Sequence, residues 1–202
     1  MNLFAMLLCL GAGVLCGRVF FPPELVALAD GPLLTTVLRL LVLAVGVQLG
    51  SDRSLPAKVR RLGPGMLLVP LGVVAGTLLG GWVAGWLTGM DAHLSGAVAA
   101  GFGWYSLSAV LLKELAGSQV ATLAFLANVF RELLAFAVIP LAARTLGYRA
   151  AIAPGGATAM DTTLPVILRS TDEATGAVAV LTGAVCSALT PVLVPLLYGL
   201  GA

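Results

Sequence analysis

The sequence predicts an all-α integral membrane protein with a transporter-like organisation, and three observations lead to that prediction. The chain has 202 residues, of which 59% are hydrophobic and only 10% are charged. Its mean hydropathy is +1.06, whereas a soluble domain carries about 25% charged residues. The apolar residues form long runs with short connections, so we expect a single transmembrane transporter domain over residues 1–202.

Seven hydrophobic segments are candidates for crossing a bilayer, which takes about 20 apolar residues. They are residues 2–20, 33–50, 64–89, 93–112, 119–144, 150–168 and 174–200. The first lacks a basic start and a cleavage site, so we expect a retained helix rather than a signal peptide. The last contains Pro191 and Pro195, which predict an interruption. The fourth and sixth are expected to be broken or re-entrant, around Gly101–Ser108 and Gly155–Pro165.

Basic residues between the segments predict the orientation, because cytoplasmic loops are rich in Lys and Arg. The strongest group follows the second segment and comprises Arg53, Lys58, Arg60 and Arg61. We therefore expect this loop and the N-terminus to be cytoplasmic and the C-terminus to be external. Seven full spans would leave Arg144 and Arg149 outside, against the rule, and this conflict indicates that a broken segment does not cross.

Glycines recur at four-residue steps in the third segment. The two series are Gly72, Gly76 and Gly80, and then Gly81, Gly85 and Gly89. Small residues at that spacing let membrane helices approach closely, which predicts a packing or dimer face. General tolerance of glycine in membrane helices explains the pattern equally well, so both interpretations stay open.

Asp161 lies in the most informative stretch of the chain, residues 154–165, where two prolines and two glycines break any helix. A carboxylate at membrane depth is costly and usually functional, and irregular backbone is tolerated there only in protein or along a cavity. We therefore predict a substrate or proton site. Its other candidates are Gly155, Gly156, Thr158, Thr162 and Thr163. The alternative is a structural carboxylate that caps the half-helix near Thr162.

A second group, Asn128, Arg131 and Glu132, lies in the fifth segment, and spacings of three and four place its members on one helical face. Arg131 and Glu132 are neighbours and point in different directions, so each is expected to find its partner elsewhere. Two membrane carboxylates favour a cationic substrate exchanged for a proton. The alternative is a buried, charge-neutral cluster that only fixes helix packing.

The third group lies in Gly101–Ser108, where two glycines weaken the helix. Its candidate contacts are Trp104, Tyr105, Ser106 and Ser108. Aromatic faces attract ammonium groups. The alternative is a kinked helix whose serines bond back to their own backbone.

Other classes of function find no support in the sequence. No protease, hydrolase or phosphate-loop motif is visible, so we expect no enzyme and no cofactor. Cys9, Cys16 and Cys186 are isolated in apolar segments without metal-ligand spacing. The basic residues are scattered, so no nucleic-acid partner is expected.

Three motifs closely resemble the bacterial lysine exporter family often called LysO. They are residues 101–108, the Arg-Glu-Leu-Leu stretch that begins at Arg131, and residues 156–165, in the same order and spacing. Val45-Gly-Val-Gln-Leu49 matches as well. The resemblance implies export of L-lysine and toxic lysine analogues across the inner membrane, with Glu132 and Asp161 as the acidic residues needed for export. It points less firmly to proton coupling.

Longer members of that family carry additional N-terminal segments, so we expect either a homodimer or a partnership with a small membrane subunit. Distant similarity to cation–proton antiporter folds implies crossed, broken helices. Only one helix separates the two broken segments, so full spans would run parallel. Either one segment is re-entrant, or its symmetry partner comes from another chain. The rival functions are a sodium/proton-type antiporter and a subunit that transports only with a partner.

Overall fold

The computed structural model describes residues 64–201, together with residues 11–13, 15–17, 36, 40, 43 and 47. The chain divides into two units, Met1–Ala44 and Val45–Ala202, and the fold below is that of the second. The first two predicted segments, the basic loop between them and the third, and the Val45–Leu49 motif lie mostly or wholly outside the described residues.

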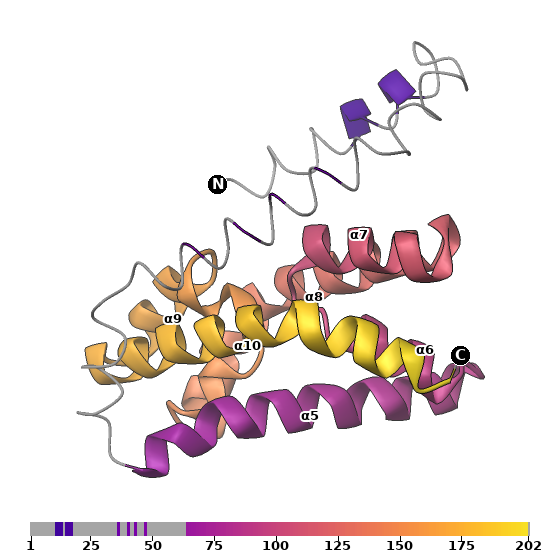
Figure 1. Ribbon diagram of the computed structural model, residues 1–202. Coiled ribbons are helices and arrows are strands. Elements are labelled where there is room, and N and C mark those ends of the chain that lie inside the picture. The colour runs from indigo at the N-terminus through magenta and orange to yellow at the C-terminus, as the bar shows by residue number, and fades with distance from the viewer. Residues whose placement is uncertain are drawn as a thin grey trace. The chain divides into compact units, whose positions relative to one another are not determined.

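The described part of the second unit is built from helices alone, which confirms the predicted fold class (Figure 1). The helices are α5 (Pro64–Thr88), α6 (Ala92–Ala99), α7 (Tyr105–Ala116), α8 (Ser118–Thr145), α9 (Leu164–Ser170) and α10 (Glu173–Gly199), with short 3-10 turns η2 (Ala150–Ile152) and η3 (Gly156–Met160). Within the part of the chain that the structure describes, three helices are long and apolar enough to cross a membrane, over Leu68–Thr88, Ser118–Thr145 and Glu173–Gly199. This is a multi-pass membrane protein.

Helix α10 is continuous, so the predicted interruption at Pro191 and Pro195 is wrong. Prolines also lie inside α5 and α8, at Pro70 and Pro140. Membrane helices tolerate proline because neighbouring groups satisfy the freed backbone carbonyls. The seventh predicted segment is therefore one uninterrupted span.

The fourth predicted segment is a re-entrant hairpin, made of α6, a turn at residues 100–103, and α7. Phe102 and Gly103 have φ angles of 49° and 93°, which reverse the chain. Helix α7 then runs back along the first half of α8, where the ring centroids of Tyr105 and Phe125 lie 5.4 Å apart. Gly117 alone separates α7 from α8, so the hairpin leaves at the end of the bundle where it entered.

The sixth predicted segment is a second re-entrant hairpin, made of η2, η3 and α9. Its entering limb, at Tyr148 and Ile152, lines the same cavity as Asp172 at the beginning of α10. Helix α9 has seven residues and a length of about 10 Å, too short to continue across a bilayer. This hairpin therefore also leaves where it entered.

The two hairpins enter from opposite ends of the bundle and meet at their tips. Helix α10 shows this, because its first turn lies at the mouth of the second hairpin and Tyr198 near its end contacts His93 at the start of the first. At the tips, the Ala157 N–H donates to the Phe102 carbonyl at 2.8 Å. The two broken segments therefore oppose each other within this chain, in agreement with the re-entrant alternative.

The two glycine series of α5 differ in their surroundings. A side chain at Gly81 or Gly85 would collide with Ala99 or Ser95 of α6, so these glycines allow α5 and α6 to pack closely. This confirms the packing interpretation for part of the pattern. Gly72, Gly76 and Gly80 have no described atom within reach of an added Cβ, and the dimer face remains a prediction.

Candidate functional site

Asn128 of α8 holds the tip of the first hairpin. Its Oδ1 accepts a hydrogen bond from the Gly103 N–H at 2.7 Å. Its Nδ2 lies within donating distance of the Val98 carbonyl and the Ser108 hydroxyl, at 3.2 and 3.3 Å. The side chain is buried, and a Cβ at Gly101 would lie 2.6 Å from it. This amide satisfies backbone groups that the turn takes out of the helix.

Arg131, one turn further along α8, holds the second hairpin. Its Nε donates to the Pro154 carbonyl at 3.2 Å and its Nη2 to the Ala153 carbonyl at 3.1 Å. These carbonyls follow η2, where the backbone dipole is negative. The structure therefore gives Arg131 a positioning contact with the tip. It forms no ion pair with Glu132 among the described residues, as the sequence predicted.

The threonines of the second hairpin have two different surroundings. The Thr158 hydroxyl donates to the Gly155 carbonyl at 2.9 Å, and the Thr163 hydroxyl donates to the Thr158 carbonyl at 3.0 Å. Both side chains are buried, so they stabilise the turn itself. Thr162 instead lies beside the two acidic residues. Gly156 has a φ angle of 57° and lies against the Phe102 carbonyl, so its lack of a side chain permits the contact between the tips.

Glu132 and Asp161 come together in the structure, although they belong to different elements. Glu132 is 4% exposed, and the groups that act on its carboxyl are Thr162 and Asp161 of the second hairpin. Asp161 is exposed, and its Oδ1 accepts from the Thr162 N–H and hydroxyl. Tyr105, at the tip of the first hairpin, interacts electrostatically with both carboxylates. The two acidic residues therefore lie near the tips of both hairpins.

The alternative role for Asp161, as a cap, does not match the geometry. Helix α9 begins at Leu164 and its N-cap residue is Thr163. The Asp161 carboxylate bonds only to Thr162, its neighbour in sequence, and not to a donor in the first turn of α9. Its second oxygen, Oδ2, accepts no hydrogen bond among the described residues.

The remaining predicted residues of the first hairpin lie in three different surroundings. Trp104 is the residue before α7 and is partly buried, whereas Ser106 is exposed and belongs to no described hydrogen bond. Ser108 donates back to the Tyr105 carbonyl at 3.3 Å, as the kinked-helix interpretation expected, and lies beside Asn128. The structure therefore brings Ser108 and Asn128 together but does not bring Ser106 to them.

Sequence analysis missed Ser187 on α10. Its hydroxyl is 1% exposed and has no hydrogen-bond partner among the described residues. The neighbouring hydroxyls of Thr182 and Thr190 bond back to their own helix at 2.8 and 2.9 Å. Ser187 follows Gly183, which packs against the second tip, by four residues and therefore shares its face. In the sequence, only the four-residue spacing between Gly183 and Ser187 indicates that Ser187 faces the second hairpin.

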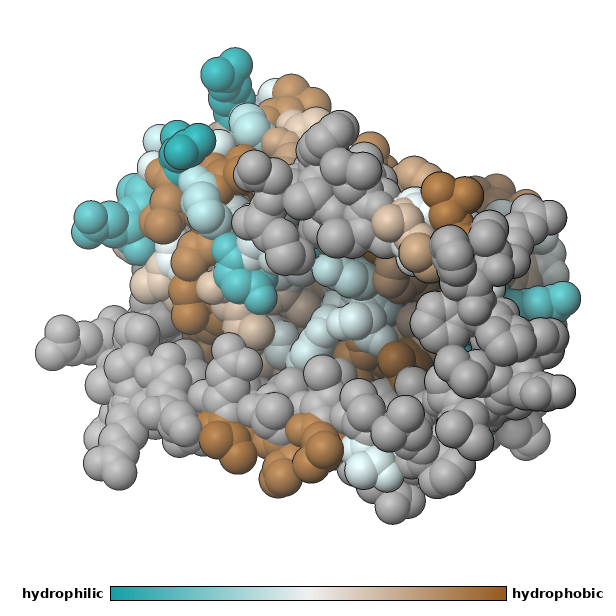
Figure 2. Space-filling view, turned by 90° about the horizontal axis from the view of Figure 1, so that it is seen from above, coloured by the Kyte–Doolittle hydropathy of each residue, from teal (hydrophilic) through white to brown (hydrophobic). Residues whose placement is uncertain are grey.

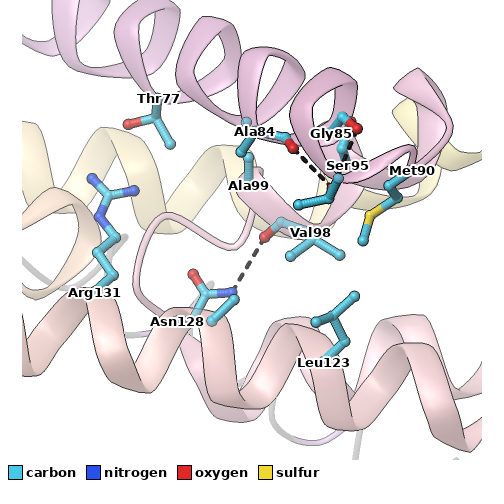
Figure 3. Close-up of a pocket in the computed structure, with 13 residues that line it drawn as sticks. Thr77, Ala84, Gly85, Met90, Ser95, Val98, Ala99, Leu123, Asn128 and Arg131 are labelled. Carbon is cyan, nitrogen blue, oxygen red and sulfur yellow. Dashed lines mark hydrogen bonds between the residues drawn. The ribbon is translucent and has the colours of Figure 1, made fainter.

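A cavity of about 320 Å³ lies on the other side of the tips, between α5, α6 and α8 (Figure 3). Asn128 and Arg131 form part of its wall beside apolar residues such as Val98 and Leu123. Glu132 and Asp161 do not line it. This cavity is therefore distinct from the place where Glu132 and Asp161 lie. The described residues contain no group of His, Cys, Asp and Glu suited to a metal ion.

Comparison with known proteins agrees with the geometry. The family model "Lysine exporter LysO" matches residues 7–198. The chain is 35% identical over 157 residues to "Lysine exporter LysO" of Escherichia coli K12, covering 78% of this chain and 52% of that protein. It is 34% identical over 158 residues to the "Putative lysine exporter" of Haemophilus influenzae, covering 78% of this chain and 80% of that protein.

The chain thus spans about half the length of the Escherichia coli relative. No solved structure matches it. The family is one of transporters and not of enzymes. The match over nearly the whole sequence, together with two opposed hairpins around an acidic site, leads to one conclusion: this chain belongs to the LysO lysine exporter family.

Proposed function

We propose that the protein exports L-lysine and its toxic analogues by proton antiport through Glu132 and Asp161. The observation that carries this proposal is that a buried carboxylate of α8, Glu132, and the exposed Asp161 of the second hairpin both lie near Thr162. Opposed hairpins place unwound backbone and half-helix ends around a central site, as in transporters with inverted repeats. The names of the relatives support lysine as the substrate.

The two carboxylates have different surroundings and therefore different roles. Asp161 is exposed and bonded only to Thr162, so it receives the ε-ammonium group of lysine. Glu132 is buried in the spanning helix α8, and carboxylates inside membrane spans mark proton relays. Glu132 therefore carries the exchanged proton. Tyr105 offers its ring and hydroxyl to the substrate.

Transport by proteoliposomes containing the single chain tests this proposal. We expect a proton gradient to drive lysine flux without sodium, and expect both Glu132→Gln and Asp161→Asn to abolish coupled flux. Glu173→Gln is the matched control, because Glu173 lies exposed in the first turn of α10. Full proton-coupled flux in Asp161→Asn would refute the assignment. Sodium-driven exchange without lysine would favour the rival antiporter, and flux only after adding a second chain would favour the subunit.

The hairpin topology also supports a definite orientation. Arg144, Arg149 and Arg169 lie at the end of the bundle where α5 begins, just after the basic loop that ends at Arg61. Lys113 is the one described Lys or Arg at the opposite end. Figure 2 shows the hydrophilic residues of the visible face gathered mostly at the first end. We therefore assign the mouth of the second hairpin to the cytoplasm and the C-terminus to the outside of the inner membrane.

The conflict in the predicted topology disappears with this assignment. Because both broken segments return to the end where they enter, Arg144 and Arg149 lie at the end of the bundle where α5 begins, and in sequence the basic loop directly precedes α5. Cysteine labelling tests this: a single cysteine in place of Arg149 is expected to react with a membrane-impermeant reagent only from the cytoplasmic face. Labelling from the outside would refute the orientation.

A further inference from the structure

A second cavity, of about 250 Å³, lies at the mouth of the second hairpin, away from the acidic site. We call it the mouth cavity. Its walls come from the entering limb of the hairpin and from the first turns of α10. The lining residues used below are Tyr148, Arg149, Ile152, Asp172, Thr175 and Val178.

The mouth cavity carries one cationic and one anionic side chain that do not neutralise each other. Arg149 and Asp172 both line it, yet they form no ion pair, and the Arg149 side chain has no hydrogen-bond partner among the described residues. Asp172 uses its Oδ1 to accept from the Thr175 N–H at 2.7 Å. Its second oxygen remains available, so the cavity offers a donor group and an acceptor group at once.

The rest of the lining is apolar. Ile152 and Val178 are fully buried or nearly so, at 0% and 2% exposure, and form the inner wall. Tyr148 is 49% exposed. A ligand that satisfies this lining needs an anionic group, a cationic group and an aliphatic portion in a small volume. The zwitterionic end of an α-amino acid with a methylene side chain has this combination.

We propose that the mouth cavity is a loading site for α-amino acids, in which Arg149 binds the carboxylate and Asp172 binds the α-ammonium group. The methylene chain of lysine then lies along Ile152 and Val178. This proposal rests on the proposed function, because it makes the cavity the cytoplasmic entry to the exporter. The ammonium and phosphate of a phosphatidylethanolamine headgroup share the same chemistry, and the experiment below separates the two ligands.

The test measures the KM for lysine in everted membrane vesicles, whose outer face is the cytoplasmic one. We expect Arg149→Gln and Asp172→Asn each to raise the KM about threefold with the maximal rate unchanged, since exposed ionic contacts contribute only weakly to binding. Asparagine caps a helix as well as aspartate does, so Asp172→Asn removes the charge and keeps the bond to Thr175. Arg144→Gln is the control, because Arg144 is exposed nearby outside the cavity.

Lysine analogues, measured as competitive inhibitors, distinguish binding from a structural effect. Lysine methyl ester lacks the carboxylate, so its inhibition constant is expected to be the same in the wild type and Arg149→Gln. Nα-acetyllysine lacks the α-ammonium, so its constant is expected to be unaffected by Asp172→Asn. An effect of equal size for lysine and both analogues would overturn the proposal, as would unchanged KM values in both variants.

The lipid alternative is tested by repeating the measurement in proteoliposomes with phosphatidylethanolamine or with phosphatidylcholine in its place. The loading site predicts the same KM changes in both lipids. Changes that occur only with phosphatidylethanolamine, without the analogue pattern, would reassign the cavity to a headgroup and overturn the proposal. Absence of lysine flux in the wild type would refute the proposed function as well, whereas normal flux with unaltered variants would refute the loading site alone.

Discussion

Gly156→Ala tests the contact between the two hairpin tips most directly. The φ angle of Gly156 is 57°, and an added Cβ would meet the Phe102 carbonyl and lie 2.7 Å from Nη2 of Arg131. The Phe102 carbonyl is also the acceptor of the bond from the Ala157 N–H. The substitution therefore forces the tips apart at the point where they are joined.

The expected magnitude has two parts. An alanine in the left-handed region costs about 1–2 kcal/mol. Separation of the tips leaves the Ala157 N–H or the Phe102 carbonyl without its partner, which costs about 1–3 kcal/mol in a buried position. The sum is about 2–5 kcal/mol in the free energy of unfolding. Lysine transport should fall as well, because Asp161 follows the displaced tip.

Gly147→Ala is the matched control, because Gly147 also has a positive φ, of 92°, but no described atom lies within 4 Å of an added Cβ. It carries the backbone strain without the collision, so we expect a loss of only about 1–2 kcal/mol. Denaturant titration in detergent, followed by tryptophan fluorescence, measures both variants. If Gly156→Ala costs no more than Gly147→Ala, the tips are not joined as the structure shows.

Four further outcomes are expected. Asn128→Ala should destabilise the protein by about 1–3 kcal/mol, because it leaves the buried Gly103 N–H unpaired; a smaller loss than in an exposed substitution such as Ser106→Ala, measured by denaturation, would contradict this. Arg131→Lys should increase amide exchange at residues 153–157, because one ammonium cannot reproduce both contacts of the guanidinium; unchanged exchange would exclude the positioning role. Ser187→Ala should leave stability unchanged or raise it by up to about 1 kcal/mol, since no described bond is lost; a clear loss of stability would reveal a partner. Hydrogen bonds from Thr175 hold the pKa of Asp172 below its ordinary value near 3.8. The Asp172 carboxylate therefore stabilises the fold above that pH, and this stabilisation disappears as the pH falls through the lowered pKa. Asp172→Asn should remove this acid-dependent part of the melting temperature, and a pH profile identical to that of the wild type would contradict it.

Much of this protein could be predicted from sequence because hydrophobic length and charge are local properties. Long apolar runs with few charges define the spanning helices α5, α8 and α10. Proline, glycine and a carboxylate within an apolar run mark residues 154–165 as an irregular polar segment at membrane depth. The identity of Glu132 and Asp161 as candidates follows from the cost of charge in a bilayer, which does not depend on the fold.

The course of the chain after each break could not be predicted in this way. Glycines at positions 101 and 103 permit a kink as readily as a reversal, and only packing of α7 along α8 selects the reversal. The same holds for α9, whose return beside α10 depends on contacts such as Leu168 against Gly176. Sequence alone therefore left open whether the broken segments run parallel or opposed.

Membrane location, the places where the helices are interrupted and the acidic residues carried there could be read from the residues in order, because each depends on the chemistry of neighbours along the chain. Folding alone shows that both interruptions are hairpin tips that meet within one chain and that Glu132 and Asp161 lie near each other. These facts depend on contacts between residues far apart in sequence, such as Ala157 with Phe102 and Arg131 with Pro154, and such contacts exist only once the helices have packed.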